Sequence, residues 1–245
     1  MSLMILINCS LCLLTSVQRI TLQEGLGDAM RSRFDEQLKL LNRKMTEMGG
    51  ECESIIAAAG KALLQGSAED ARRAQEQGHR IDQLEREIES ICLKLLLQQQ
   101  PVARDLRVIS AALKMITDME RIGDQAEDIA EIITTLGGRT GAECRDIRVM
   151  AEATIKMVTD SVEAYVRQDL SLARAVIEYD DVVDEAFCRV NGTLIAMIAQ
   201  NTADGEYALD LLMIAKYFER IGDHAVNIAE WVEFSVTGEH KSDSM

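Results

Sequence analysis

The sequence is poor in the residues that favour β-sheets or interrupt helices. Pro101 is the only proline among 245 residues, and aromatic residues make up 4% of the chain. β-branched and aromatic residues favour strands, whereas the Ala, Leu, Met, Glu and Arg that abound here favour helices. The composition therefore predicts an all-α protein with almost no strand.

Long apolar runs are also scarce. Residues 1–29 contain an apolar core of about twelve residues, which is shorter than the roughly twenty that a transmembrane helix needs. The segment lacks the basic start of a secretory signal, and MRSRFDEQL from Met30 onwards looks like a natural beginning. We expect residues 1–29 to be a leader outside the folded repeat and the body of the protein to be cytoplasmic.

The cysteines form neither a disulfide framework nor a zinc motif. Cys9 and Cys12 are the only close pair among six cysteines, and no second pair follows to complete a site. Cys52, Cys92 and Cys188 fall in apolar helical phases. We predict buried free thiols at these three positions, which agrees with a reducing compartment.

Positive charge is in short supply. The chain has 41 acidic and 26 basic residues, and its net charge is −15. Such a surface repels the phosphate backbone, so the charge argues against direct binding to nucleic acid. Cations and the basic faces of other proteins are better suited as partners.

One acidic motif occurs twice. ERIGDQAEDIAE from Glu120 to Glu131 and ERIGDHAVNIAE from Glu219 to Glu230 agree at nine of twelve positions. Upstream, the sequence around Asp82 corresponds to that around Asp184. The duplication predicts two copies of one unit, residues 30–138 and residues 139–238, followed by a tail of residues 239–245.

Helix start and stop signals divide each copy into three helices. The main signals are Gly66, Ser67, Pro101, the glycine pair at 137–138 and Asp169. We predict helices over residues 30–66, 67–98, 101–138, 142–167, 169–200 and 203–236. Because the connections are short, consecutive helices should pack antiparallel, which gives two tandem three-helix bundles.

Carboxylates recur at helical spacing within these elements. Glu120 and Asp124 lie one turn apart, as do Glu219 and Asp223 in the second copy, and Asp180 and Asp184 in the fifth helix. Like charges at this spacing repel each other, so each stripe needs a compensating positive charge. Bound cations could supply it. Alternatively, basic side chains could do so, with candidates at Arg86, Arg121, Arg189 and Arg220.

The repeated ERIGDxAxxIAE motif, the segment QQQPVARDLRVI and the start MRSRFDEQLKLLNRKMTEMGG together resemble the PhoU family of phosphate-signalling accessory proteins. The resemblance implies two tandem three-helix bundles and a negative regulator of the phosphate-starvation response. It implies as partners the ATPase subunit of the phosphate ABC transporter, a sensor histidine kinase and its response regulator, and a peripheral position at the membrane through these partners. It also implies a homodimer and a multinuclear metal cluster of iron or zinc, with magnesium or manganese as further options.

The family's metal motif maps onto both copies. In the second copy, Asp180 and Asp184 would face Glu219 and Asp223. In the first copy, Asp82, Glu120 and Asp124 match, but Gly78 stands where the second copy has Asp180, with His79 beside it. The resemblance thus implies a complete second site and an incomplete first one. His224, Asp128 and Asn227 would flank these sites as outer ligands.

Two other functions remain open. Ferritin-like di-metal enzymes need Glu-x-x-His in two helices, and the chain does not contain that pair of motifs. We therefore expect no enzyme activity. A scaffold that docks basic protein surfaces without metal is the other alternative, and chelation would distinguish it from a metal-dependent adaptor.

Overall fold

The computed structural model describes residues 2–99 and 101–239, with side chains placed for residues 31–97 and 101–239. The described residues form only helices and turns, as the composition predicts. The six α-helices are α1 (Ser2–Gln65), α2 (Ala68–Gln99), α3 (Ala103–Thr135), α4 (Arg145–Arg167), α5 (Leu170–Gln200) and α6 (Gly205–Thr237). Short 3-10 turns, Ala142–Cys144 and Thr202–Asp204, lead into α4 and α6.

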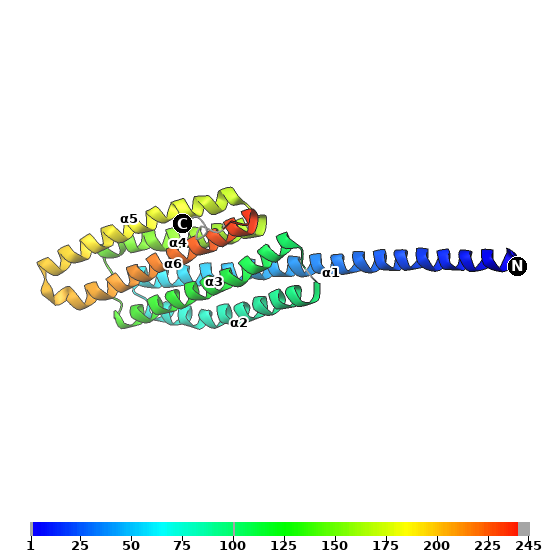
Figure 1. Ribbon diagram of the computed structural model, residues 1–245. Coiled ribbons are helices and arrows are strands. Elements are labelled where there is room, and N and C mark those ends of the chain that lie inside the picture. The colour runs from blue at the N-terminus through cyan, green and yellow to red at the C-terminus, as the bar shows by residue number, and fades with distance from the viewer. Residues whose placement is uncertain (1, 100, 240–245) are drawn as a thin grey trace.

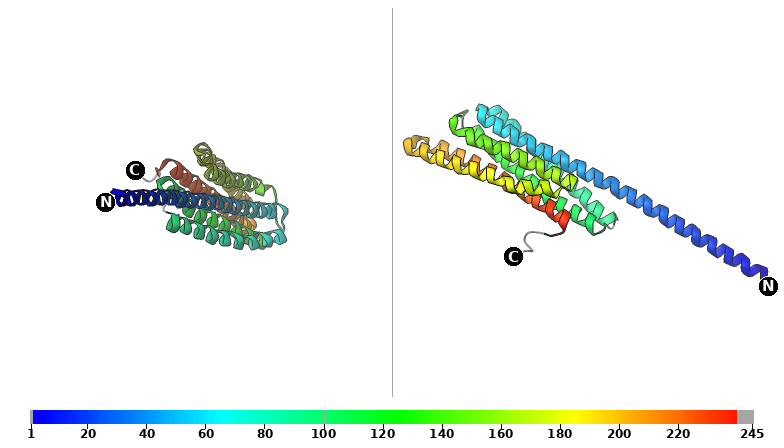
Figure 2. Two further views of the ribbon diagram at one scale, coloured as in Figure 1. Left: turned by 90° about the vertical axis from the view of Figure 1, so that its right-hand side faces the viewer. Right: turned by 90° about the horizontal axis from the view of Figure 1, so that it is seen from above.

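The helices form the two tandem three-helix bundles predicted from the repeat. α1, α2 and α3 make the first bundle, and α4, α5 and α6 make the second (Figure 1). The bundles pack side by side through α3 against α6 and α1 against α4, so that α2 and α5 lie on the outer sides (Figures 1 and 2). Each outer helix forms a solvent-facing seam with α3 or α6.

α1 is longer than predicted. It was expected to start near Met30, but it begins at Ser2, and its first half projects beyond the bundles (Figure 1). No proline lies before Met30, and the helix continues through Gly25 and Gly27 without ending. The side chains of residues 1–30 and the tail residues 240–245 lie outside the described ones, so the leader and the tail stay predictions.

Local signals set the other helix ends. The backbone N–H of Asp70 donates to Ser67 Oγ at 3.2 Å, and Asp169 Oδ1 accepts from the N–H groups of Ser171 and Leu172 at 2.9 and 3.1 Å. Gly66 ends α1 with φ +63°, and a Cβ there would lie 2.4 Å from the carbonyl oxygen of Gly138. The α1–α2 turn and the α3–α4 turn therefore touch through backbone, which only glycine allows.

The core follows the apolar helical phases. In α3, Ile109, Ile116, Ile122 and Ile129 are buried, and Leu113 packs partly buried against them. None of the helices in the described part of the chain is both long and apolar enough to cross a membrane.

The cysteine prediction is correct at two positions and wrong at one. Cys52 and Cys92 are buried free thiols, whereas Cys188 is exposed. α5 is an outer helix, and its face at 188 shares the solvent side with Glu185 and Arg189. An apolar phase in an outer helix therefore does not guarantee burial.

Polar contacts join the two bundles at the α3–α6 interface. Asp118 Oδ1 lies 2.9 Å from His224 Nδ1 and accepts a hydrogen bond from Asn227 Nδ2 at 3.1 Å. At the equivalent place in the other direction, Tyr217 hydrogen-bonds to Asp128. Asp118 and Tyr217 occupy equivalent positions in the two copies, as do Asp128 and Asn227. The interface therefore has approximate two-fold symmetry. Asn227 and Asp128, expected beside the metal sites, thus face the neighbouring bundle, and Asp128 also lies close enough to the first-copy carboxylates to raise the pKa of Asp124.

Candidate metal centre

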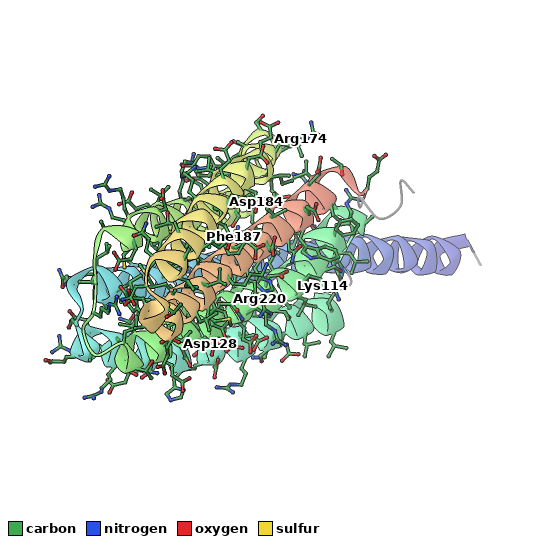
Figure 3. All side chains as sticks on the ribbon, turned by 90° about the vertical axis from the view of Figure 1, so that its left-hand side faces the viewer. Lys114, Asp128, Arg174, Asp184, Phe187 and Arg220 are labelled. Atoms are coloured by element: carbon green, nitrogen blue, oxygen red, sulfur yellow. The ribbon has the colours of Figure 1, made fainter. Side chains whose placement is uncertain are left out.

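Four carboxylates predicted as ligands gather on the α5–α6 seam, and we call Asp180, Asp184, Glu219 and Asp223 the second acidic cluster. The pKa of Asp180 is raised to about 6, first by burial and then by Asp184, Asp223 and Glu219. Such mutual repulsion requires the four groups to lie close together. Figure 3 shows Asp184 on α5, beside the α6 helix that carries Arg220.

A glycine lets Asp180 approach α6. A Cβ at Gly222 would lie 2.9 Å from Asp180 Oδ1 and 3.5 Å from Val183 Cγ1. Any larger residue would push the carboxylate away from the helix. The repeated glycine of the ERIGD motif therefore makes room for an acidic side chain in this copy.

Within the described residues, Glu219 is the member of the second acidic cluster that has an ion-pair partner, but one of its oxygens lacks a hydrogen bond. Its Oε2 atom is buried and accepts no hydrogen bond within the described residues. Lys216, one turn away, makes an ion pair with the same oxygen, but the orientation does not give a directed hydrogen bond. The Lys216 ammonium also lies 5.6 Å from the centre of the Phe187 ring. Lys216 thus already supplies one positive charge to this oxygen, and a metal ion would add the directed ligation that the ammonium does not give.

The first acidic cluster lies on the matching α2–α3 seam. Burial and then Asp124 raise the pKa of Glu120, and burial followed by Asp82 among the nearby carboxylates raises that of Asp124. Arg121 lowers both pKa values, and its Nε lies 3.5 Å from Glu120 Oε2. The three predicted ligands of the first copy therefore lie on one seam, near enough for their charges to affect one another's pKa.

Two further carboxylates join the first cluster. Burial raises the pKa values of Glu85 and Glu127, and Asp82 raises both further. We therefore define the first acidic cluster as Asp82, Glu85, Glu120, Asp124 and Glu127.

Glu127 occupies the place that Gly78 leaves open. A Cβ at Gly78 would lie 1.2 Å from Glu127 Oε1, so the carboxylate rests directly on the glycine. In the second copy the pair is reversed, because Asp180 matches Gly78 and Val226 matches Glu127. This carboxylate therefore lies on the outer helix α5 in the second copy and on the inner helix α3 in the first copy. Comparing Gly78 and Glu127 together with Asp180 and Val226 would have revealed this exchange in the sequence.

The basic side chains proposed as alternatives leave most of the acids unpaired. Arg121 pairs only with its neighbour Glu120, and Arg189 pairs with Asp146 and Glu185, away from either cluster. Among the described residues, Arg86 and Arg220 make no ion pair. Neither do seven of the nine carboxylates of the two clusters, namely Asp82, Glu85, Asp124, Glu127, Asp180, Asp184 and Asp223.

The donor atoms suit hard or borderline cations, although they are not fully converged. Within the described residues, no three His, Cys, Asp or Glu side chains are close enough to form a ready metal site. Even so, both clusters supply carboxylate oxygens from two helices, and one of these oxygens is buried without a hydrogen bond. The residues therefore fit a carboxylate-bound metal, provided that side-chain rotations bring the oxygens together.

The chain matches known proteins along both bundles. The model of the PhoU domain matches residues 45–133 and 147–232, one stretch in each bundle. A phosphate-specific transport system accessory protein PhoU homolog from a Burkholderia species is 35% identical over 216 residues, which cover 85% of this chain and 91% of that protein. A homolog of the same description from Synechocystis is 34% identical and covers 90% of this chain and 99% of its own.

Solved structures agree with these matches. The crystal structure of PhoU from Pseudomonas aeruginosa has a TM-score of 0.80 and 32% identity, covering 84% of this chain and all (100%) of that one. PhoU from Streptococcus pneumoniae, 24% identical, has the same fold at a TM-score of 0.77 over 84% of this chain and 98% of its own. Two matched domains and relatives of nearly full length identify this chain as a member of the PhoU family.

Proposed function

We propose that this protein is a cytoplasmic accessory protein of a phosphate-specific transport system, without enzyme activity of its own. The observation that carries the proposal is the nearly full-length similarity to accessory proteins of that name. In this role it couples the ATPase subunit of the phosphate ABC transporter to a sensor histidine kinase and its response regulator. It represses the starvation response when phosphate is plentiful and acts as a homodimer.

The two acidic clusters bind metal ions in this proposal. The unpaired carboxylates, the raised pKa of Asp180 and the buried oxygen of Glu219 support it. Iron, zinc, magnesium or manganese would supply the positive charge that the other carboxylates need beyond the pairs of Lys216 with Glu219 and Arg121 with Glu120. In the second cluster Asp180, Asp184, Glu219 and Asp223 hold the ion. In the first cluster Asp82, Glu120 and Asp124 do so, with Glu127 in place of the missing carboxylate at Gly78.

Each cluster joins an outer helix to an inner one. Neutralising the carboxylates removes the repulsion across the seam, so α2 and α5 are held more firmly against α3 and α6. The surface formed by the outer helices is then fixed for recognition by transporter and kinase domains. The apolar core beneath the seam does not depend on this neutralisation.

Elemental analysis of protein purified without chelator or nickel affinity tests the metal sites. Glu219→Ala combined with Asp223→Ala should lose the metal of the second cluster and bind the sensor kinase more weakly. Glu178→Ala combined with Glu206→Ala is the matched control, since both side chains are exposed on the same two helices outside the cluster. Full metal content in the first double variant would disprove the site.

The role of Glu127 is tested in the same way. Glu127→Gln should lower the metal content of the first cluster, and Glu131→Gln, one turn along α3 and exposed, should not. If Gly78→Asp combined with Glu127→Val restores the metal that Glu127→Gln removes, the exchange between helices is confirmed functionally.

A metal-independent scaffold is the second candidate, because no three donor side chains converge among the described residues. In that case the acidic seams dock basic protein surfaces directly. Binding of the kinase that is unchanged by a chelator but weakened by salt would favour the scaffold.

A further inference from the structure

The hairpin end between α2 and α3 exposes apolar side chains. Leu93, Leu97, Val102 and Leu106 are exposed by 47, 83, 59 and 44%, and we call these four residues the α2–α3 tip. They are half of the eight large hydrophobic residues exposed among the described ones. Apolar side chains grouped in this way usually mark a binding surface rather than ordinary surface variation.

The surroundings of the α2–α3 tip are basic, although the protein as a whole is strongly acidic. Residues 90–117 contain four basic side chains, namely Lys94, Arg104, Arg107 and Lys114, but only one acidic one, Asp105. Asp105 is already engaged, because its Oδ2 lies 3.3 Å from Arg31 Nη1. Lys94 and Arg104 are exposed and make no ion pair within the described residues. The tip therefore combines apolar side chains with an uncompensated positive charge.

A shallow hollow beside the tip adds a place for an anionic group. Its volume is about 460 Å³, and Arg86, Ser90 and Lys94 line it together with Gln83, Glu87 and Ile91. Lys44 Nζ lies 2.9 Å from Glu87 Oε2, so the one carboxylate in the hollow is already paired. Among the described residues Arg86 and Lys94 make no ion pair, so two cationic groups and the Ser90 hydroxyl remain to face a ligand.

The second copy provides an internal comparison. Its hairpin end between α5 and α6 also exposes apolar residues, with Ile195 at 62%, Leu209 at 59% and Met213 at 45%. Residues 191–218, however, contain three acidic side chains and a single basic one. The two hairpin ends lie at opposite ends of the molecule (Figure 1). The two hairpin ends thus expose apolar side chains to a similar degree, but the α2–α3 tip lies in a basic stretch of sequence and the α5–α6 end in an acidic one. We call Ile195, Leu209 and Met213 the α5–α6 tip.

We propose that the α2–α3 tip docks on an anionic lipid bilayer. Apolar side chains that project from a convex hairpin end can enter the interface of a bilayer, which needs no preformed pocket. Lys94, Arg104 and Arg86 then face lipid phosphates, and the hollow beside them accommodates a headgroup. The α5–α6 tip, with its acidic surroundings, is repelled from the same surface. This inference does not depend on the acidic clusters or on their metal.

Vesicle sedimentation with the full chain tests the proposal. Wild type should bind vesicles of phosphatidylcholine mixed with phosphatidylglycerol, and should bind pure phosphatidylcholine vesicles much more weakly. Lys94→Gln combined with Arg104→Gln should lower the partition coefficient about 25-fold, since each basic group near an anionic surface contributes about 1 kcal/mol, or about fivefold. High salt should have a similar effect.

The apolar part of the tip has a matched control in the second copy. Leu97→Ser combined with Val102→Ser should reduce binding to the anionic vesicles about tenfold or more. Ile195→Ser combined with Leu209→Ser removes side chains of similar exposure from the acidic tip and should leave binding unchanged. Circular dichroism and thermal unfolding verify that each variant folds.

Several results would overturn the proposal. Equal binding to neutral and anionic vesicles would place membrane affinity in another segment, such as the start of α1, which all variants retain. Equal losses in the two serine variants would remove the distinction between the tips. If Leu97→Ser combined with Val102→Ser changed the oligomeric state in light scattering without changing vesicle binding, the tip would be a contact between copies of the chain.

Discussion

Replacing Asp180 by Asn should stabilise the metal-free protein at neutral pH. The pKa of this carboxyl group is raised from its ordinary value of 3.8 to about 6, chiefly by burial and then by the charge of Asp184. The folded state therefore holds the proton more tightly than the unfolded state. The free energy of unfolding of the wild type falls as the pH rises from 3.8 to about 6 and stays at the lower value above that.

The structure sets the size of the effect. The difference between 3.8 and about 6 corresponds to about 3 kcal/mol. Because Asp180 is partly exposed, solvent screening reduces this to about 1.5 kcal/mol. Asn has nearly the same shape and cannot ionise, so Asp180→Asn should be more stable than wild type by about 1.5 kcal/mol at about pH 7. The advantage should disappear at about pH 4, where the wild-type carboxyl is protonated in the folded state.

Urea unfolding followed by circular dichroism, in the presence of a chelator, measures this difference. Asp181→Asn is the control, because Asp181 is exposed on the same helix, and it should change stability by less than about 0.5 kcal/mol. The reasoning fails if Asp180→Asn is less stable than wild type at neutral pH, or if its advantage persists in acid. Added metal should reverse the order, since it stabilises the complete cluster of the wild type more than that of the variant.

Three other substitutions test features of the fold. Gly66→Ala should lower the free energy of unfolding by about 3 kcal/mol, because the added Cβ meets the carbonyl oxygen of Gly138 and the residue has a positive φ. Gly137→Ala also has a positive φ but open space around it, and should lower the free energy of unfolding by about 1 kcal/mol. Urea unfolding of the two variants compares these costs. Asp118→Ala removes the carboxylate that accepts hydrogen bonds across the α3–α6 interface, and it should lower the free energy of unfolding by about 1–2 kcal/mol. The midpoint of thermal unfolding should fall, and an unchanged midpoint would show that the contact contributes nothing. Asp169→Ala removes the N-cap of α5 and should cost about 1 kcal/mol, with faster amide hydrogen exchange in the first turn of that helix as its specific sign.

Most of the fold could be predicted because its signals are local. The hydroxyl of Ser67 and the carboxylate of Asp169 cap the helices where the sequence indicates, and Gly66 ends α1 as predicted. A stripe of carboxylates at helical spacing likewise depends on a single helix. The predicted start of α1 is too late, because the repeat begins only near Met30 whereas the helix itself continues upstream to Ser2.

Contacts between helices could not be derived in this way. Glu127 reaches its place only because Gly78, on another helix, leaves room for it. His224 borders the second acidic cluster, where it lowers the pKa of Asp223, but the sequence does not indicate that its ring bonds to Asp118 in the other bundle. Such contacts follow from the packing of helices against one another, within a bundle or between bundles, which the spacing along one helix does not contain.

The exchanged contacts between Asp118 and Asn227 and between Tyr217 and Asp128 are those that two identical single bundles would make across a dyad axis. In such a homodimer any substitution would appear twice, and assembly would depend on protein concentration. Joining both bundles in one polypeptide removes both restrictions. The two halves can then carry unlike surfaces, one end basic and the other acidic, and so present different faces to different surroundings.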